Sequence, residues 1–260
     1  MNQEPIVRLK NLHKNFGCVK AVEDVCLDIQ PGEIFGFLGP NGAGKTTTIA
    51  MMLGLIHSSS GQIEIMGEKI TPGKTKILGH VGALVGASSA IIPYLSAREH
   101  LKLVARLHPD VDARRIEEVL DMVNLSDAAG RKAGKYSTGM KQRLGMAMAL
   151  VHKPELLIPD EPTNGMDPAG MRDMRLLLTR LASEGVTIFL SSHLLHEVEQ
   201  VCERVALLNN GRVIADGNVA TLIKRMTPDM QTQTTNPTNP VINPAGVDLE
   251  SVFLQLTQTA

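Results

Sequence analysis

A glycine-rich segment near the start of the chain has the residue types and spacing of a loop that holds phosphate groups. Residues 39–44 read GPNGAG and are followed by Lys45 and Thr46, which gives the pattern GxxxxGK[ST]. Glycines let successive backbone N–H groups face an anion, and the N-terminus of a following helix adds positive potential. Lys45 can neutralise the β and γ phosphates of a nucleotide, and the Thr46 hydroxyl can ligate Mg²⁺. The predicted nucleotide contacts in this loop are Gly39, Pro40, Asn41, Gly42, Ala43, Gly44, Lys45, Thr46 and Thr47.

The alternative to a phosphate loop is an ordinary glycine-rich turn before a helix. The four fixed positions coincide by chance in roughly one chain in a hundred of this length. The segment also lies between a strand pattern at 33–38 and a helical pattern at 46–55, which is the context that a phosphate loop requires. These two observations favour the phosphate loop.

Two adjacent carboxylates, Asp160 and Glu161, follow the apolar segment 156–158. If that segment is a strand of a parallel sheet, both side chains emerge at the carboxyl edge, where ligands bind. Asp160 can then hold Mg²⁺, usually through water, and Glu161 can orient and deprotonate an attacking water. The alternative is a polar pair that only ends a strand, and the phosphate loop earlier in the chain disfavours it.

Residues 136–143 read YSTGMKQR and contain the pattern Ser-x-Gly-x-x-Gln. Ser137 can cap a helix that begins near Met140, so that its hydroxyl and the Gly139 amide face an anion at the positive helix end. The stretch resembles the signature sequence of ABC (ATP-binding cassette) ATPases and lies upstream of the acidic pair, as in that family. The resemblance implies that the anion is the γ phosphate of ATP held by the other subunit. The alternative is a serine-capped surface helix.

Three further segments match motifs of the same family and occur along the chain in the order that the family has. Asn164-Gly-Met-Asp167 resembles the loop that crosses the dimer interface, and Ser191-Ser192-His193 resembles the switch histidine, which implies that His193 bonds the γ phosphate. Taken alone, a histidine at a strand end is more often structural. Phe16 matches the position at which the family stacks an aromatic ring on adenine. Its alternative is a core or edge-strand residue.

Residues 5–225 are similar to the ATPases of bacterial export systems, particularly those for drug, bacitracin and lantibiotic resistance. The similarity rests on KNFG, FGFLGPNGAGKTTTI, YSTGMKQRLGMA and SSHLLHEVEQVCERVALLNNGRV. It implies Mg²⁺-dependent hydrolysis of ATP in a head-to-tail dimer with an identical copy or a homologous mate. It also implies membrane-spanning partner subunits and a cytoplasmic location on the inner face of the membrane. A weakly hydrolysing regulatory or dimerisation module is the alternative.

Two positions depart from the family pattern. Gly86 stands where the family usually has Gln or Glu, so no side chain there can sense the metal or the partner. Pro159 stands where the family has an aliphatic residue, and a proline cannot donate to the strand ladder. The lost hydrogen bond is worth on the order of 1 kcal/mol. We expect Pro159→Leu and Gly86→Glu to raise ATP turnover or its stimulation by the partner, and unchanged turnover in both would remove this hypothesis.

The elements that must position these residues can be read from hydrophobic periodicity. Residues 6–29 alternate as an antiparallel pair of strands, and from residue 141 onwards helical and strand patterns alternate as in a parallel sheet. The other predicted elements are strands at 33–38, 61–70, 156–158 and 186–190 and helices at 46–55, 96–108, 112–123, 141–151 and 169–184. Together with the resemblance, this predicts an α/β fold of the P-loop NTPase class, with a RecA-like core. An antiparallel β subdomain at the N-terminus and an inserted α-helical subdomain at about 87–150 complete it.

The ATPase domain is expected to span residues 1–226. Residues 227–246, rich in Thr, Asn and Pro, are expected to form a flexible linker. In the tail 247–260, Leu249, Val252, Phe253 and Leu256 recur at helical spacing, which predicts a short docked helix.

Composition argues against a protein that tracks nucleic acid, a zinc-binding or disulfide-rich protein, and a chain that spans a membrane by itself. With 26 Lys and Arg against 27 Asp and Glu, the chain has no basic excess for tracking nucleic acid. Cys18, Cys26 and Cys202 form neither a zinc pattern nor a disulfide framework, which fits a reducing cytosol. No apolar run of about 18 residues occurs and the first ten residues lack a secretory core, so we expect that the chain does not cross a bilayer alone.

Overall fold

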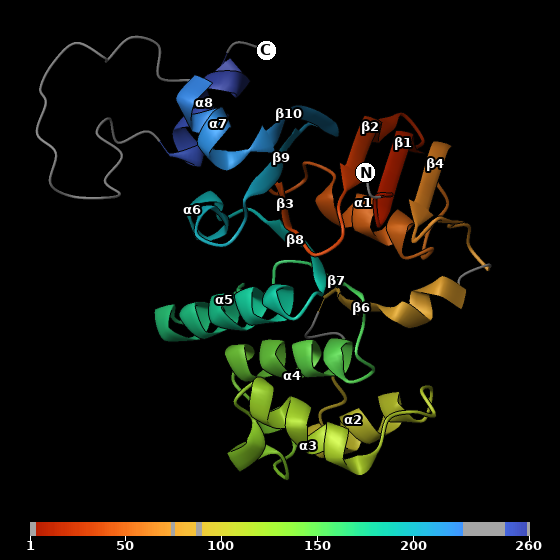
Figure 1. The fold of residues 1–260 in the computed structure, drawn as a ribbon, viewed down its shortest axis with the longest axis vertical. Helices are drawn as coiled ribbons and strands as arrows, with labels where there is room; N and C mark the ends of the chain where they lie inside the picture. The colour runs from red at the N-terminus through yellow and green to blue at the C-terminus, as the bar shows by residue number, and fades with distance from the viewer. Residues whose placement is uncertain (1–3, 74–75, 87–89, 226–247, 259–260) are drawn as a thin grey trace, which may run out of the picture.

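The computed structural model describes residues 4–73, 76–86, 90–225 and 248–258 (Figure 1). The predicted linker at 227–246 lies outside these residues. None of the helices in the described ranges combines the length and the apolar composition of a membrane span.

Four strands near the N-terminus form an antiparallel sheet with the order β2-β1-β4-β5. They are β1 (Val7–Phe16), β2 (Val19–Ile29), β4 (Ser60–Ile65) and β5 (Glu68–Lys69). In the β1–β2 pair, Val7 lies opposite Ile29 and Leu9 opposite Leu27, all four buried. The alternation of apolar and polar residues at 6–29 is thus explained, because one face of this sheet packs on the core.

The second sheet has six strands in the order β10-β9-β3-β8-β7-β6. They are β3 (Ile34–Leu38), β6 (Val81–Leu84), β7 (Leu156–Pro159), β8 (Thr187–Ser192), β9 (Arg204–Asn209) and β10 (Arg212–Asn218). The pairs that join β6, β7, β8, β3 and β9 are parallel, and only β10 is antiparallel. Their carboxyl ends therefore meet at one edge, as the sequence predicts.

Among the described residues, five helices flank this sheet or continue from its strands, and a sixth near the C-terminus packs on two of these helices. They are α1 (Lys45–Met52), α4 (Thr138–Leu150), α5 (Pro168–Ser183), α6 (Leu195–Glu199), α7 (Val219–Arg225) and α8 (Leu249–Gln258). Helix α1 ends at Met52 rather than at residue 55, because Gly54 adopts a left-handed φ of 63° just beyond the helix end.

Between β6 and β7 the chain forms a helical region, at the lower end of Figure 1. It contains α2 (Ala97–Ala105), α3 (Ala113–Met122), η2 (Ser126–Ala128), η3 (Ala133–Lys135) and α4, whereas the short helix η1 (Lys76–His80) comes directly before β6. Ser96 and Asp112 cap α2 and α3 as predicted. At α2, the Ser96 backbone N–H and hydroxyl and the Lys132 ammonium donate to Glu99 and hold its pKa at about 2.

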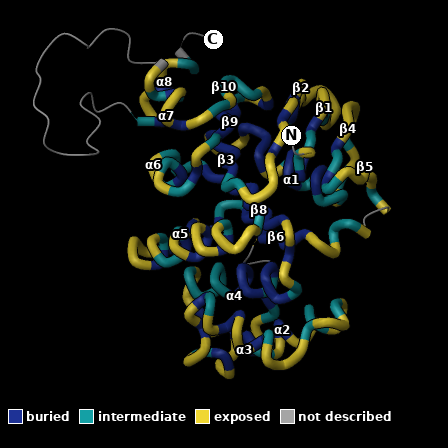
Figure 2. Tube along the Cα trace, viewed as in Figure 1, coloured by how far each residue is buried: buried dark blue, intermediate teal, exposed yellow. Residues whose placement is uncertain are grey.

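The five parallel strands of the six-stranded sheet are mostly buried, whereas the edge strand β10 is half-buried or exposed (Figure 2). On one face, Phe35, Phe37 and Phe189 pack with the antiparallel sheet and α1. On the other face, Leu157 and Leu190 pack with α4, α5 and the C-terminal helices. Successive strand residues therefore enter opposite cores, which explains why these strands are continuous apolar runs.

Helix α8 docks against α6 and α7. Leu249 and Val252 are fully buried, and the Leu249 N–H donates to Glu199 of α6 over 3.5 Å. The tail helix thus packs on the element that begins two residues after His193.

Truncating Leu249 tests this docking. Leu249→Ala removes a fully buried side chain and is expected to lower the free energy of unfolding by about 2–5 kcal/mol. Leu254 lies on the same helix but is 51% exposed, so Leu254→Ala should cost less than about 0.5 kcal/mol. Urea unfolding of both variants measures the difference, and equal losses would show that α8 is not docked through Leu249.

Candidate active site

The loop after β3 can adopt its path only with glycines at key positions. A Cβ on Gly39 would lie 2.2 Å from the Leu208 carbonyl oxygen, and one on Gly44 would lie 2.5 Å from that of Ala21. Gly42 and Gly44 also have left-handed φ values of 83° and 107°. The Gly39 N–H donates to the Ser192 carbonyl over 3.3 Å, which ties the loop to β8. The glycines therefore form a backbone cradle, with Asn41 exposed and Ala43 buried beneath it.

Lys45 is the first residue of α1 and lies under this cradle. Its ammonium donates to the carbonyls of Gly39 over 2.7 Å and of Pro40 over 3.2 Å. It also lies 3.3 Å from Glu161 Oε1 as an ion pair, with the lysine side chain only 5% exposed. A buried ammonium held by its own loop is prepared to meet an anion with little loss of side-chain entropy.

Asp160 accepts hydrogen bonds from two hydroxyl groups. Thr46 donates to its Oδ2 over 2.9 Å, and Ser191 donates to its Oδ1. Carboxylate and hydroxyl oxygens are the hard donors that Mg²⁺ prefers, so Thr46 and Asp160 fit that ion. Thr47, the next residue of α1, is half-buried.

Glu161 is held in an unusual conformation between two basic side chains. Its φ is 52°, a region that non-glycine residues seldom adopt and that often marks functional sites. His193 Nδ1 lies 2.7 Å from Glu161 Oε2, opposite the contact with Lys45. The structure therefore brings together Lys45, Thr46, Asp160, Glu161 and His193 from three distant parts of the sequence.

Ser137, Gly139 and Asp167 lie apart from the cluster around Glu161. Ser137 caps α4, which begins at Thr138 rather than near Met140, and its hydroxyl accepts from the Met140 N–H over 3.2 Å. Asp167 caps α5 by accepting from the Gly170 N–H over 3.0 Å. Within the described ranges, no hydrogen bond or ion pair joins these three residues to Lys45, Glu161 or His193.

The start of α4 contacts the loop that leads to Asp167. Gln142 Nε2 donates to the Asn164 carbonyl over 3.3 Å. A Cβ on Gly165 would lie 2.7 Å from Thr138 Cγ2, so that glycine permits the close approach. The Ser-x-Gly-x-x-Gln segment and the 164–167 loop thus form one surface.

Phe16 lies at the end of β1 and is 52% exposed, with Lys14 Nζ 4.7 Å from its ring centroid. The alternative that Phe16 belongs to the core is therefore wrong. Its exposed ring is available for stacking.

Ser191 is the residue that the sequence prediction omitted from the site. It is fully buried, its hydroxyl contacts Asp160, and its carbonyl accepts from the Glu161 N–H over 3.1 Å. The apolar run that precedes Ser191 indicates a strand. Only the pairing of β8 with β7 shows that this strand brings Ser191 beside the acidic pair.

Two positions depart from the family pattern. The first, Pro159, is the last residue of β7 and lies opposite Leu84 of β6. Gly86 follows β6 with a left-handed φ of 56°. A glutamate at that position would therefore adopt a backbone conformation that disfavours side chains.

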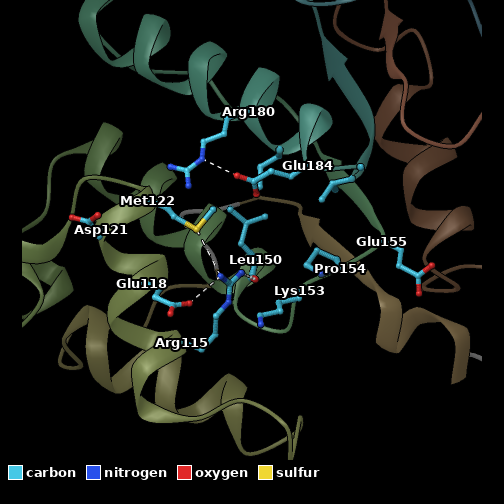
Figure 3. Close-up of a pocket in the computed structure, with 13 residues that line it drawn as sticks. Arg115, Glu118, Asp121, Met122, Leu150, Lys153, Pro154, Glu155, Arg180 and Glu184 are labelled. Carbon is cyan, nitrogen blue, oxygen red and sulfur yellow. Dashed lines mark hydrogen bonds and ion pairs between the residues drawn. The ribbon is translucent and has the colours of Figure 1, made fainter.

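A cavity of about 540 Å³ lies away from this site, between α3, the end of α4 and the end of α5 (Figure 3). Its arginines are ion-paired within the lining, Arg115 with Glu118 at 3.7 Å and Arg180 with Glu184 at 2.9 Å. Glu155, which precedes β7, also lines it, so the cavity faces the amino end of the strand whose carboxyl end carries the acidic pair. It takes no part in the geometry described above.

Comparison with known proteins identifies the family to which this chain belongs. The family described as ABC transporter matches residues 22–164, more than half of the chain. The bacitracin transport ATP-binding protein BcrA of Bacillus licheniformis is 46% identical over 212 residues, covering 81% of this chain and 69% of its own length. The uncharacterized ABC transporter ATP-binding protein YhcH of Bacillus subtilis is 45% identical over 215 residues, covering 82% of this chain and 70% of its own.

A solved dimeric ATP-binding cassette, in a post-hydrolysis state bound to ADP and Pi, has the same fold. Its TM-score is 0.73 at 27% identity, covering 82% of this chain and 98% of its own. The predicted fold class, a P-loop NTPase with an antiparallel β subdomain and an inserted helical subdomain, is therefore confirmed. The chain belongs to the ABC transporter family, as an ATP-binding subunit with ATPase activity.

Proposed function

We propose that this subunit hydrolyses Mg²⁺-bound ATP in a head-to-tail dimer and thereby drives the export of drugs or antimicrobial peptides through separate membrane subunits. The observation that carries the proposal is a single charged cluster at the carboxyl edge of the sheet. There Lys45 and His193 flank Glu161 at 3.3 and 2.7 Å, beside the Thr46–Asp160 pair.

The cradle and Lys45 bind the phosphates in this proposal. Backbone N–H groups within residues 41–47 and the Lys45 ammonium face the β and γ phosphates, and Phe16 stacks on the adenine. Thr46 and Asp160 hold Mg²⁺, which when bound neutralises the phosphate oxygens. Asp160 is already oriented for this role because both of its oxygens accept hydrogen bonds.

Glu161 acts as the general base. It accepts a proton from the attacking water while the water oxygen forms a bond to the γ phosphorus. The bond from that phosphorus to the bridging oxygen breaks, leaving ADP and inorganic phosphate. His193 lies at hydrogen-bond distance from Glu161, so it can orient this carboxylate and contact the γ phosphate. The left-handed φ of Glu161 is consistent with a residue held for chemistry rather than for stability.

One copy of the chain supplies only half of the site. Ser137 and Gly139 lie at the positive end of α4 but contact none of the groups around Glu161 in the described structure. A second copy, or a homologous mate, placed head to tail would bring them to the γ phosphate, with Asp167 at the interface. ATP then joins the two copies, and loss of phosphate after hydrolysis releases them.

The proposal of export is supported by the relative named as a bacitracin transport ATP-binding protein and by one surface of this chain. Tyr94 is 73% exposed, beside the half-buried Ile92 and ahead of α2. This aliphatic and aromatic patch is the proposed contact for helices of the membrane subunits. A patch that only packs under a loop is the alternative, yet Tyr94 has most of its surface in solvent.

Coexpression with a multi-span membrane protein, where the neighbouring reading frames encode one, tests the export proposal. A bacterial host that carries both proteins should tolerate more bacitracin than one that carries either alone, and Glu161→Gln should abolish the gain. If ATP turnover is barely detectable and tolerance is unchanged, the chain is instead the weakly hydrolysing regulatory module.

A further inference from the structure

The ladder between β7 and β8 is interrupted beside the acidic pair. Leu156 pairs with Thr187 and Leu157 with Ile188, but the next pairing between the two segments is an isolated bridge between Asp160 and Ser191. Pro159 lies in this interruption, and a proline has no N–H to donate. Beyond Leu157, β7 is therefore joined to β8 mainly at Ser191.

Ser191 makes two hydrogen bonds at this junction. Its hydroxyl donates to Asp160 Oδ1, and its carbonyl accepts from the Glu161 N–H over 3.1 Å. It is fully buried and pairs with Phe37 of β3 on its other side, so its own position is fixed. One residue on a central strand thus contacts both acidic residues, one through its side chain and the other through its main chain.

We propose that Ser191 is a positioning residue that aims Asp160 and Glu161 in place of the ladder bond that Pro159 cannot make. The inference rests on the proposed roles of the two carboxylates. With Thr46 on Oδ2 and Ser191 on Oδ1, the Asp160 carboxylate is fixed in one plane. The left-handed Glu161 backbone persists because its N–H is held, and displacements of about 1 Å in such groups can cost about a hundredfold in rate.

Binding without turnover provides the first test. We expect Ser191→Ala to raise the Mg²⁺ concentration for half-maximal binding of a fluorescent ATP analogue about tenfold, because a hydrogen bond to a charged group is lost. Ser191→Thr keeps the hydroxyl and should restore the midpoint. Thr187→Val is the matched control, since it removes another buried hydroxyl from β8, one that accepts from the Gly32 N–H at the far end. Thermal unfolding of each variant checks that it is folded.

A double-mutant cycle tests the link to Pro159. Ser191→Ala should lower kcat about tenfold in the natural background and about twofold in the Pro159→Leu background, where a ladder N–H is restored.

The outcomes separate this inference from the proposed function. If folded Ser191→Ala keeps the natural Mg²⁺ midpoint, or if its effect on kcat is the same in both backgrounds, Ser191 is not the positioning residue although the ATPase assignment stands. If the natural chain binds the analogue with no dependence on Mg²⁺, the proposed roles of Thr46 and Asp160 fail and this inference fails with them.

Discussion

Replacing Glu161 with glutamine is expected to lower the rate of ATP hydrolysis by about 10²–10⁴ while ATP binding is retained. Glutamine has nearly the same shape and can still accept a hydrogen bond from Lys45 or His193, but it cannot take a proton from water. Phosphate release at saturating ATP measures the loss, and titration with a fluorescent ATP analogue measures binding.

Glu155 provides the matched control for that substitution. It lies at the other end of β7, and its exposed side chain pairs with His80 at 3.1 Å. Glu155→Gln should therefore hydrolyse ATP at nearly the natural rate. Hydrolysis by Glu161→Gln at more than about a tenth of the natural rate would contradict the role of Glu161 as general base.

Replacing Lys45 with alanine is expected to weaken ATP binding by about 10- to 100-fold, as for the loss of hydrogen bonds to a charged group. The substitution removes the buried ammonium and its hydrogen bonds to the Gly39 and Pro40 carbonyls, of which Pro40 keeps the Ala43 N–H as a donor. Isothermal titration with ATP and Mg²⁺ measures the change in affinity.

Lys20→Ala is the control for charge alone. Lys20 forms an exposed ion pair with Glu23 at 3.2 Å, and such pairs contribute little. ATP affinity should therefore be unchanged in this variant. If both lysine variants bind ATP as tightly as the natural chain, the loop at 39–46 does not hold the phosphates.

Much of the fold could be predicted because local signals and tertiary structure agree in this chain. Ser96, Asp112 and Ser137 each cap the helix that their residue type and position predict. The glycine-rich loop lies between a strand and a helix, as its pattern requires. The end of α1 was misplaced because the helical pattern continues past Met52, whereas the conformation of Gly54 ends the helix.

The parts that the sequence did not reveal depend on contacts between distant segments. The contact of Ser191 with Asp160 follows from the pairing of β8 with β7, which residue types alone do not specify. The same holds for the left-handed Glu161 and its contact with His193. For Phe16, the choice between core and surface depended on where β1 ends relative to its neighbours. Helical spacing predicts a helix in the tail, but not that it packs on α6.

The most direct test of the account is the mass of the Glu161→Gln chain in solution with ATP and Mg²⁺. If ATP is bound between two copies, light scattering should give twice the 28.1 kDa of a single chain with nucleotide present, and a single chain without it. Blocking hydrolysis in this variant should keep the copies together long enough to be measured. A mass of one chain at saturating ATP, also in the presence of the membrane subunits, would contradict the account.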